Sequence, residues 1–302
     1  MKLRHIAMIL LAVAGVSVTS CIREDYSDCH NRYVVDLSYM GNGTEDIFSK
    51  KIEKVRMYIF DNGNRCVHQT GLTEDEVGRQ QTMLPPMEPG DYRIVFLGNM
   101  HSTATAGLES GDFSRMYFAS EAYMEGSTVS GNDSLYWASL DYTIEPFFEE
   151  RGVTSRTAEF SSSHYDIIVE VIGVPQSAVT DAPMIVLTGV SPHTDFTNTA
   201  TESEETVYVL DPVHDGKDKV TASCNILRHL DHENVYLRIL DAGGAEMVSV
   251  NFAEFIEENK DHIDCSKNEV VIPFKVTFNA SHTQVEVTVP DWWVIDVRPG
   301  WN

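Results

Sequence analysis

Apolar and polar residues alternate in short runs along most of the chain after residue 30, and turn sequences separate these runs. Val55, Met57 and Ile59 share one face of an extended segment, because successive side chains of a strand point to opposite faces. Residues 61–64, Asp-Asn-Gly-Asn, follow this segment and predict a hairpin with residues 65–69. The same reasoning predicts further strands at residues 33–39, 92–97, 155–160, 165–172, 184–188, 206–210, 220–227, 235–240, 269–278 and 284–289.

Helix signals are few. Asn251 can cap a short helix, with Glu254 three residues later and Phe252 on the inner side. Residues 113–123 form a second candidate helix. Many short strands with frequent turns favour β-sandwiches. We therefore predict a mainly β protein with two β-sandwich domains, an N-terminal one at residues 21–160 and a C-terminal one at residues 161–302.

The first 21 residues have the pattern of a secretion signal. Lys2 and Arg4 precede an apolar run at residues 6–18, which is too short to span a bilayer. Residues 18–21, Val-Thr-Ser-Cys, resemble a bacterial lipobox, in which cleavage precedes a lipidated cysteine. We therefore expect residues 1–20 to be a lipoprotein signal peptide and Cys21 to carry the acyl chains that tether the mature protein, whose remaining residues then lie outside the cytoplasm. The alternative is an ordinary cleaved signal beside a chance cysteine.

The net charge of the chain is strongly negative, 22 − 46 = −24 at pH 7. Such a surface repels nucleic acid and anionic lipid, so we expect no nucleic-acid partner. An apolar content of 42% with 23% charged residues is typical of a folded globular chain. No second apolar run is long enough to span a membrane.

Four cysteines remain once Cys21 is lipidated: Cys29, Cys66, Cys224 and Cys265. An even number in an oxidising compartment permits two disulfides and leaves their connectivity open. A chain divided near its middle keeps the pairs Cys29–Cys66 and Cys224–Cys265 within their own domains. Four free thiols are the alternative.

No familiar catalytic, cofactor or metal motif is present. Residues 229–233, His-Leu-Asp-His-Glu, match neither order of histidine and glutamate that zinc hydrolases use, and we interpret them as a solvated loop. Residues 61–64 and 215–218 lack the terminal glutamate of a calcium loop and are read as turns. Glycine-rich phosphate loops and nucleophile elbows are also missing. We therefore expect no cofactor, no metal and no enzymatic activity.

Four parts of the chain resemble the fimbrial anchor lipoproteins of Bacteroidales. Residues 21–29, Cys-Ile-Arg-Glu-Asp-Tyr-Ser-Asp-Cys, place an acidic run between a lipidated cysteine and a second cysteine, as in that family. Residues 55–61 are similar to its first hairpin strand, which ends in Phe-Asp. Residues 89–93, Pro-Gly-Asp-Tyr-Arg, precede an apolar strand ending in Gly-Asn. Residues 292–296, Trp-Trp-Val-Ile-Asp, are similar to its closing tryptophan strand.

This resemblance implies two transthyretin-like β-sandwiches and a subunit that attaches a fimbrium, or pilus, to the bacterial outer membrane and limits its length. The implied partner is a fimbrial stalk subunit. Glu24, Asp25 and Asp28 also resemble the export signal that sends such lipoproteins to the outer face of that membrane. A solvated linker is a second reading of these residues, and both readings can hold.

Pili of this type join subunits by strand exchange, in which a segment of one subunit completes an open sheet edge of the next. In stalk subunits, proteolytic removal of the N-terminal strand opens the groove. Here the same cut would release the protein from its lipid, so residues 33–39 are expected to stay in place. The candidate donor strand is then C-terminal: Trp292, Trp293, Val294, Ile295, Asp296 and Val297. The alternative is that one tryptophan fills the core and the other lies at its rim.

A surface glycan-binding lipoprotein is the alternative function. In that case exposed aromatic side chains stack on sugar rings, and the candidates are Tyr136, Trp137 and Trp301.

Overall fold

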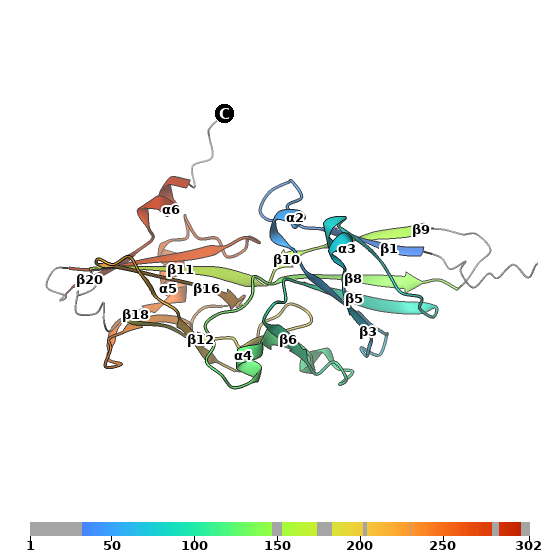
Figure 1. The fold of residues 1–302 in the computed structure, drawn as a ribbon, viewed down its shortest axis with the longest axis horizontal. Helices are drawn as coiled ribbons and strands as arrows, with labels where there is room; N and C mark the ends of the chain where they lie inside the picture. The colour runs from blue at the N-terminus through green and yellow to red at the C-terminus, as the bar shows by residue number, and fades with distance from the viewer. Residues whose placement is uncertain are drawn as a thin grey trace, which may run out of the picture.

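The computed structural model describes residues 32–146, 153–173, 183–201, 204–229, 231–279 and 284–296. Strands dominate these residues and form five sheets. The sheets group into two lobes that follow one another along the long axis of the molecule (Figure 1). We define the N-terminal lobe as the described residues up to 162 and the C-terminal lobe as those from 164 onward. No helix among the described residues is both long enough and apolar enough to cross a membrane.

Two sheets build the body of the N-terminal lobe. In the smaller sheet, β1 (Arg32–Ser38) lies between β4 (Gln81–Met83) and β9 (Val153–Glu159). β1 runs antiparallel to β4 and parallel to β9. The larger sheet has the order β10-β8-β5-β2-β3, and its strands are β2 (Val55–Phe60), β3 (Cys66–Gly71), β5 (Gly90–Gly98), β8 (Tyr136–Ile144) and β10 (Ser161–Ser162).

The C-terminal lobe has two larger sheets. The first has the order β15-β16-β11-β19-β20, with β11 (His164–Ile172), β15 (Val213–His214), β16 (Lys219–Leu227), β19 (Val271–Phe278) and β20 (Val285–Thr288). As with β1, the first strand of this lobe, β11, has an antiparallel neighbour and a parallel one. The second sheet has the order β14-β12-β17-β18, with β12 (Met184–Val190), β14 (Thr206–Leu210), β17 (Tyr236–Leu240) and β18 (Glu246–Asn251).

The fifth sheet combines strands of both lobes. Its order is β13-β7-β6, with β6 (Thr103–Ala106) and β7 (Tyr117–Ser120) from the N-terminal lobe and β13 (His193–Asp195) from the C-terminal lobe. Short helices connect the strands: α2 (Phe48–Lys51), α3 (Glu74–Gly78), the 3-10 turn η2 (Phe113–Arg115), α4 (Glu121–Met124), α5 (Phe252–Glu258) and α6 (Asp291–Asp296).

Strand β2 is buried on both faces. Val55, Met57 and Ile59 face one core cluster, which also includes β1. Tyr58 and Phe60 on the opposite face belong to a second cluster, which includes Phe118 of β7. The alternation predicted from the sequence is therefore correct, and the fifth sheet covers the face that a two-layer sandwich would leave in water.

Aspartate side chains close several turns. Asp61 Oδ1 accepts hydrogen bonds from the amides of Gly63 at 2.9 Å and Arg65 at 3.0 Å. Asp215 and Asp241 cap their own turns in the same way, at the second and fourth following amides. The predicted turns at residues 61–64 and 215–218 are therefore present, and their aspartate carboxylates accept hydrogen bonds from backbone amides.

Two local predictions differ in outcome. As expected, Asn251 caps α5 by accepting from the amide of Glu254 at 3.0 Å and Phe252 is buried; Phe255 is buried as well. The helix predicted at residues 113–123 is wrong. Only η2 and α4 are helical there, and between them β7 forms a strand because it pairs with β6 on one side and β13 on the other. Pairing with another element thus overrides the local helical preference.

Candidate functional site

The junction of the two lobes includes shared backbone hydrogen bonding. β7 pairs antiparallel with β13 from His193↔Ala119 to Asp195↔Tyr117, so one sheet crosses from lobe to lobe. Phe196, directly after β13, inserts its ring among three aromatic rings of the N-terminal lobe. Its centroid lies 5.2 Å from that of Tyr58 and 5.4 Å from that of Phe60, in edge-to-face geometry.

The N-terminal lobe inserts into the C-terminal lobe in return. Val129 is buried in the C-terminal core, and its carbonyl accepts from the amide of Val209 at 2.8 Å. Asn132 bridges to Asn225 of β16, and its side chain donates to the Tyr208 hydroxyl at 2.6 Å. Each lobe therefore contributes side chains to the core of the other.

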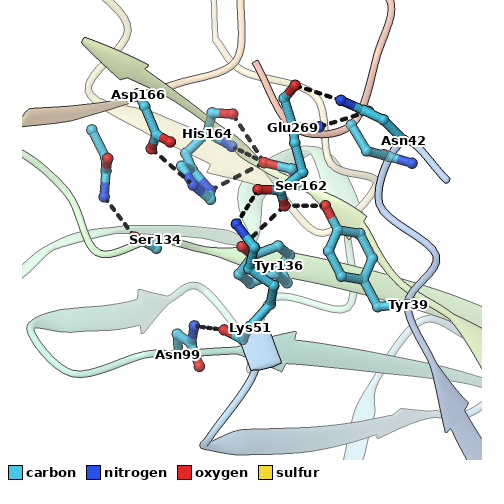
Figure 2. A network of polar contacts seen from close by, with 12 residues as sticks. Tyr39, Asn42, Lys51, Asn99, Ser134, Tyr136, Ser162, His164, Asp166 and Glu269 are labelled. Carbon is cyan, nitrogen blue, oxygen red and sulfur yellow. Dashed lines mark hydrogen bonds and ion pairs between the residues drawn. The ribbon is translucent and has the colours of Figure 1, made fainter. Parts of the chain in front are cut away.

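Glu269, in the loop before β19, is the centre of a polar network between the lobes (Figure 2). Its carboxylate accepts hydrogen bonds from the hydroxyls of Tyr39 and, at 3.2 Å, Tyr136. It also forms an ion pair with Lys51 at the end of α2. The Glu269 side chain is only 22% exposed, so these contacts are shielded from water better than those of a surface ion pair.

Backbone contacts reinforce this network. The Asn42 side chain donates to the Glu269 carbonyl at 2.8 Å and accepts from the Glu269 amide at 3.0 Å. The Asn268 side chain donates to the Gly41 carbonyl at 3.1 Å. We call the whole set the interlobe clasp: Asn268 and Glu269 of the C-terminal lobe, with Tyr39, Gly41, Asn42, Lys51 and Tyr136 of the N-terminal lobe.

The two tyrosines of the interlobe clasp remain protonated donors. Burial, followed by the neighbouring Glu269 carboxylate, raises the pKa of Tyr39 above its usual value. The same two causes raise the pKa of Tyr136. A deprotonated tyrosine beside Glu269 would place two negative charges in a partly buried site, so the hydrogen-bonded state is maintained across the physiological pH range.

Ser162, His164 and Asp166 form a serine-histidine-aspartate array beside the interlobe clasp. His164 Nδ1 lies 3.1 Å from Ser162 Oγ, and its Nε2 lies 3.4 Å from Asp166 Oδ1. Ser162 is buried, its hydroxyl donates to the His164 carbonyl at 2.9 Å, and the same Nδ1 lies 2.8 Å from the Leu135 carbonyl. This serine is inaccessible to a substrate and its proton is already engaged, so the array joins the lobes rather than presenting a nucleophile.

Two polar clefts lie along the junction. One, of about 570 Å³, is lined mainly by hydroxyl, amide and carboxylate side chains, including Ser120, Ser223, Asn132, Asp133 and Asp166. The other, of about 330 Å³, is lined by Lys50, Lys51, His101, His164, Tyr136 and Glu269, among others. The described residues contain no group of three or more histidine, cysteine, aspartate or glutamate side chains that could hold a metal ion.

The histidines of residues 229–233 are not in a fully solvated loop. His229 and His232 are half-buried, with ring centroids 5.9 Å apart, whereas Asp231 and Glu233 are exposed. His229 Nε2 accepts a hydrogen bond from the Ser191 amide at 3.2 Å. Burial, followed by the proximity of His232, lowers the pKa of His229 to about 4, so its ring is neutral at pH 7.

Cys66, Cys224 and Cys265 are free thiols in the structure, whereas Cys29, the expected partner of Cys66, lies outside the described residues. Cys224 lies on β16 opposite Ile167, whereas Cys265, in the loop after α5, contacts Tyr165. Burial raises the pKa of all three thiols, that of Cys224 to about 12, and a buried protonated thiol is unreactive. Cys21 and Cys29 lie outside the described residues.

The remaining candidates are dispersed. Trp292, Trp293, Val294, Ile295 and Asp296 lie in α6 and not in the expected strand, and Val297 lies outside the described residues. Trp293 donates its indole proton to the His262 carbonyl at 3.4 Å, and Trp292 is exposed. Tyr136 is buried and offers no free face to a sugar, whereas Trp137 is half-buried and donates its indole proton to the Phe196 carbonyl at 3.1 Å. Trp301 is outside the described residues.

The described residues thus form two interlocked, mainly β lobes that a polar clasp joins. The family of fimbrillin-A associated anchor proteins Mfa1 and Mfa2 matches residues 26–297. The chain therefore belongs to this family of fimbrial anchor proteins, which confirms the resemblance found in the sequence. Membership assigns it a fimbrial anchor role at the cell surface, in association with other fimbrial subunits.

Solved structures share the fold at low sequence identity. The fimbrial anchor protein Mfa2 of Porphyromonas gingivalis superposes with a TM-score of 0.66 at 12% identity, covering 86% of this chain and 97% of that one. A protein of Bacteroides ovatus described as an adhesin superposes with a TM-score of 0.68 at 14% identity, covering 87% of this chain and 94% of that one. A Bacteroides thetaiotaomicron protein described as polysaccharide-binding superposes with a TM-score of 0.65 at 12% identity, covering 85% of this chain and 95% of that one. No curated protein sequence matches the chain.

Proposed function

We propose that this protein is the lipid-tethered anchor at the base of a fimbrium. The observation that supports the proposal most directly is the position of β1. It begins at Arg32, paired with Val153 at the end of the N-terminal lobe that lies away from the C-terminal lobe (Figure 1). The linker from Cys21 to Arg32 covers 32 − 21 = 11 residues, which reach at most roughly 35–40 Å when extended. Acyl chains on Cys21 would thus hold the body close to the membrane, with the C-terminal lobe pointing outward.

The central position of β1 also supports the proposal that this subunit limits fibre length. β1 lies between β4 and β9, and Val35 and Leu37 are fully buried beneath the sheet. Removal of β1 would open the sheet but would also cut the chain from its tether. A subunit that keeps this strand cannot accept a donor strand in its place, so assembly ends at the membrane.

The donor role proposed for residues 292–297 requires a change of conformation. In the structure, residues 292–296 belong to helix α6. A 3.0 Å ion pair between Asp291, the first residue of α6, and Lys275 links this helix to β19. To add a strand to another subunit, α6 would unwind and this ion pair would break. Deletion of residues 292–302 tests the role: the truncated protein should still reach the cell surface but lose its fimbriae. Fimbriae retained on cells that display the truncated protein would show that another segment makes the contact.

The tether itself is tested by growing cells with labelled palmitate. The protein should acquire label and partition into detergent, and the Cys21→Ala variant should do neither. Deletion of the gene should release fimbriae into the medium. An unlabelled wild-type protein that partitions into the aqueous phase would refute the tether, whatever the state of the fimbriae.

A further inference from the structure

We infer that the β1–β9 ladder and the interlobe clasp together carry tension from the N-terminal tether into the C-terminal lobe. The inference rests on the proposed function, because β1 is under tension only if its N-terminal end is fixed and a fibre pulls on the rest of the molecule.

The direction of the strands determines how the ladder is loaded. β1 and β9 are parallel and in register from Arg32↔Val153 to Ser38↔Glu159. The tether enters the ladder at Arg32, whereas β9 leaves it at the opposite end and leads through β10 into β11 of the C-terminal lobe. A pull on the tether and an opposing pull on the C-terminal lobe therefore act along the strands from opposite ends. Such a force shears the ladder, so that all of its interstrand hydrogen bonds are strained together.

Side chains fasten β1 to both of its neighbours. Asp36 accepts a hydrogen bond from Ser155 of β9 at 2.5 Å through one carboxylate oxygen. Its other oxygen accepts from the Gln81 side chain of β4 at 2.6 Å. Leu37 donates its amide to the Gln80 carbonyl at 2.8 Å. A single carboxylate on β1 thus connects all three strands of the sheet.

The interlobe clasp lies at the inner end of the same strand. Tyr39 and Asn42 follow β1 directly, and both are hydrogen-bonded to Glu269 of the C-terminal lobe (Figure 2). For β1 to slide toward the tether, Tyr39 and Asn42 must leave Glu269. The clasp therefore prevents withdrawal of β1 and passes part of the tension directly to the C-terminal lobe, without passing through the rest of the N-terminal lobe.

Single-molecule force measurements on the mature chain test this path. One handle is attached at residue 22 and the other to a short labelling peptide inserted at Gly243, in the exposed turn between β17 and β18. Glu269→Gln and Asn42→Ala should each shorten the lifetime at constant force by about tenfold or more, because bonds to a charged acceptor and paired backbone bonds are lost. Two matched controls should leave the lifetime at constant force unchanged. Glu257→Gln breaks an exposed ion pair with Lys260, and Asn62→Ala lies in an exposed turn.

A second pulling geometry separates tension transfer from general stability. When the first handle is moved from residue 22 to the Gly63 turn, force enters through the β2–β3 hairpin and bypasses β1. The clasp variants should then have the lifetime of the wild type. Equal shortening in both geometries, or no shortening in the first, would overturn the inference. These measurements use purified protein without lipid or fimbriae, so their outcome is independent of the palmitate and fimbrial-release tests of the proposed function.

Discussion

Phe196→Ala should lower the free energy of unfolding and also make the two lobes unfold separately. Phe196 belongs to the chain of the C-terminal lobe, yet its ring is 1% exposed within the aromatic cluster of the N-terminal lobe. Truncation of a buried phenylalanine to alanine costs about 3–5 kcal/mol, and the lost edge-to-face contacts with Tyr58 and Phe60 favour the upper part of that range. Because the cavity forms between the lobes, the substitution mainly reduces the interaction free energy between them.

Equilibrium urea unfolding followed by fluorescence and circular dichroism measures both effects. The wild type should unfold in one cooperative transition, since each lobe completes the core of the other. The Phe196→Ala variant should show two separated transitions, each with a smaller dependence on denaturant than the wild type, because each then exposes the surface of one lobe only.

Phe274→Ala is the matched control. Phe274 is fully buried within the C-terminal core and stacks on Phe255 with centroids 4.4 Å apart. Its loss should cost a similar free energy while leaving a single transition, because it makes no contribution to the interlobe cluster. If Phe196→Ala unfolds in one transition with the wild-type denaturant dependence, or if the two variants behave alike, the reasoning about interlobe coupling is refuted.

Two further perturbations have expected outcomes. The folded-state pKa of His229, about 4, lies below the unfolded value of 6.5, so the stability contributed by its neutral ring is present above pH 6.5 and is lost as the pH falls toward 4. Between pH 7.5 and pH 5 the wild type should lose about 2 kcal/mol through this group, and His229→Gln should show a smaller loss in urea midpoints, whereas an identical loss would contradict the assignment. Gly189→Ala should destabilise by several kcal/mol, measured as a lower melting temperature, because Gly189 has φ +72° and an added Cβ would lie 1.9 Å from the Asn234 carbonyl oxygen. Gly216→Ala is its control, since Gly216 has φ +80° but open space around it, and an equal loss at both positions would show that backbone strain alone, and not the close contact, sets the cost.

The elements predicted from the sequence are those whose signal is local. The alternation of Val55, Met57 and Ile59, the Asn251 cap and the Asp61 turn each depend on residues a few positions apart, and all three are present in the structure. Sequence reasoning failed at residues 117–120, which form a strand because they pair with β6 on one side and, on the other, with β13 from the other lobe. It also failed at residues 292–296, where Asp291 at the start of α6 and the hydrogen bond from the Trp293 amide to the Pro290 carbonyl favour a helix over the strand that Trp-Trp-Val-Ile suggests.

The interlobe clasp could not be predicted for a different reason. Glu269 is one of many acidic residues in the chain, and nothing adjacent to it in sequence marks it as special. Its role arises because Tyr39, Lys51 and Tyr136, which are distant in sequence, meet at the lobe junction. The half-burial of His229 and His232 has the same origin, since tertiary packing covers a loop whose composition is typical of a solvated one.

The sheet shared by β6, β7 and β13 has a consequence for how this molecule can vary. If the lobes were separated, β7 of the N-terminal lobe would lose its partner β13, and the face of β2 that carries Tyr58 and Phe60 would lose its contact with Phe196. Phe196 would in turn be exposed on the C-terminal lobe. If either lobe were expressed alone, or exchanged with a lobe from another protein, it would expose an unpaired strand edge or an apolar patch that promotes aggregation. The two sandwiches are therefore not interchangeable modules but a matched pair, and substitutions at Phe196 require compensating changes at Tyr58 and Phe60.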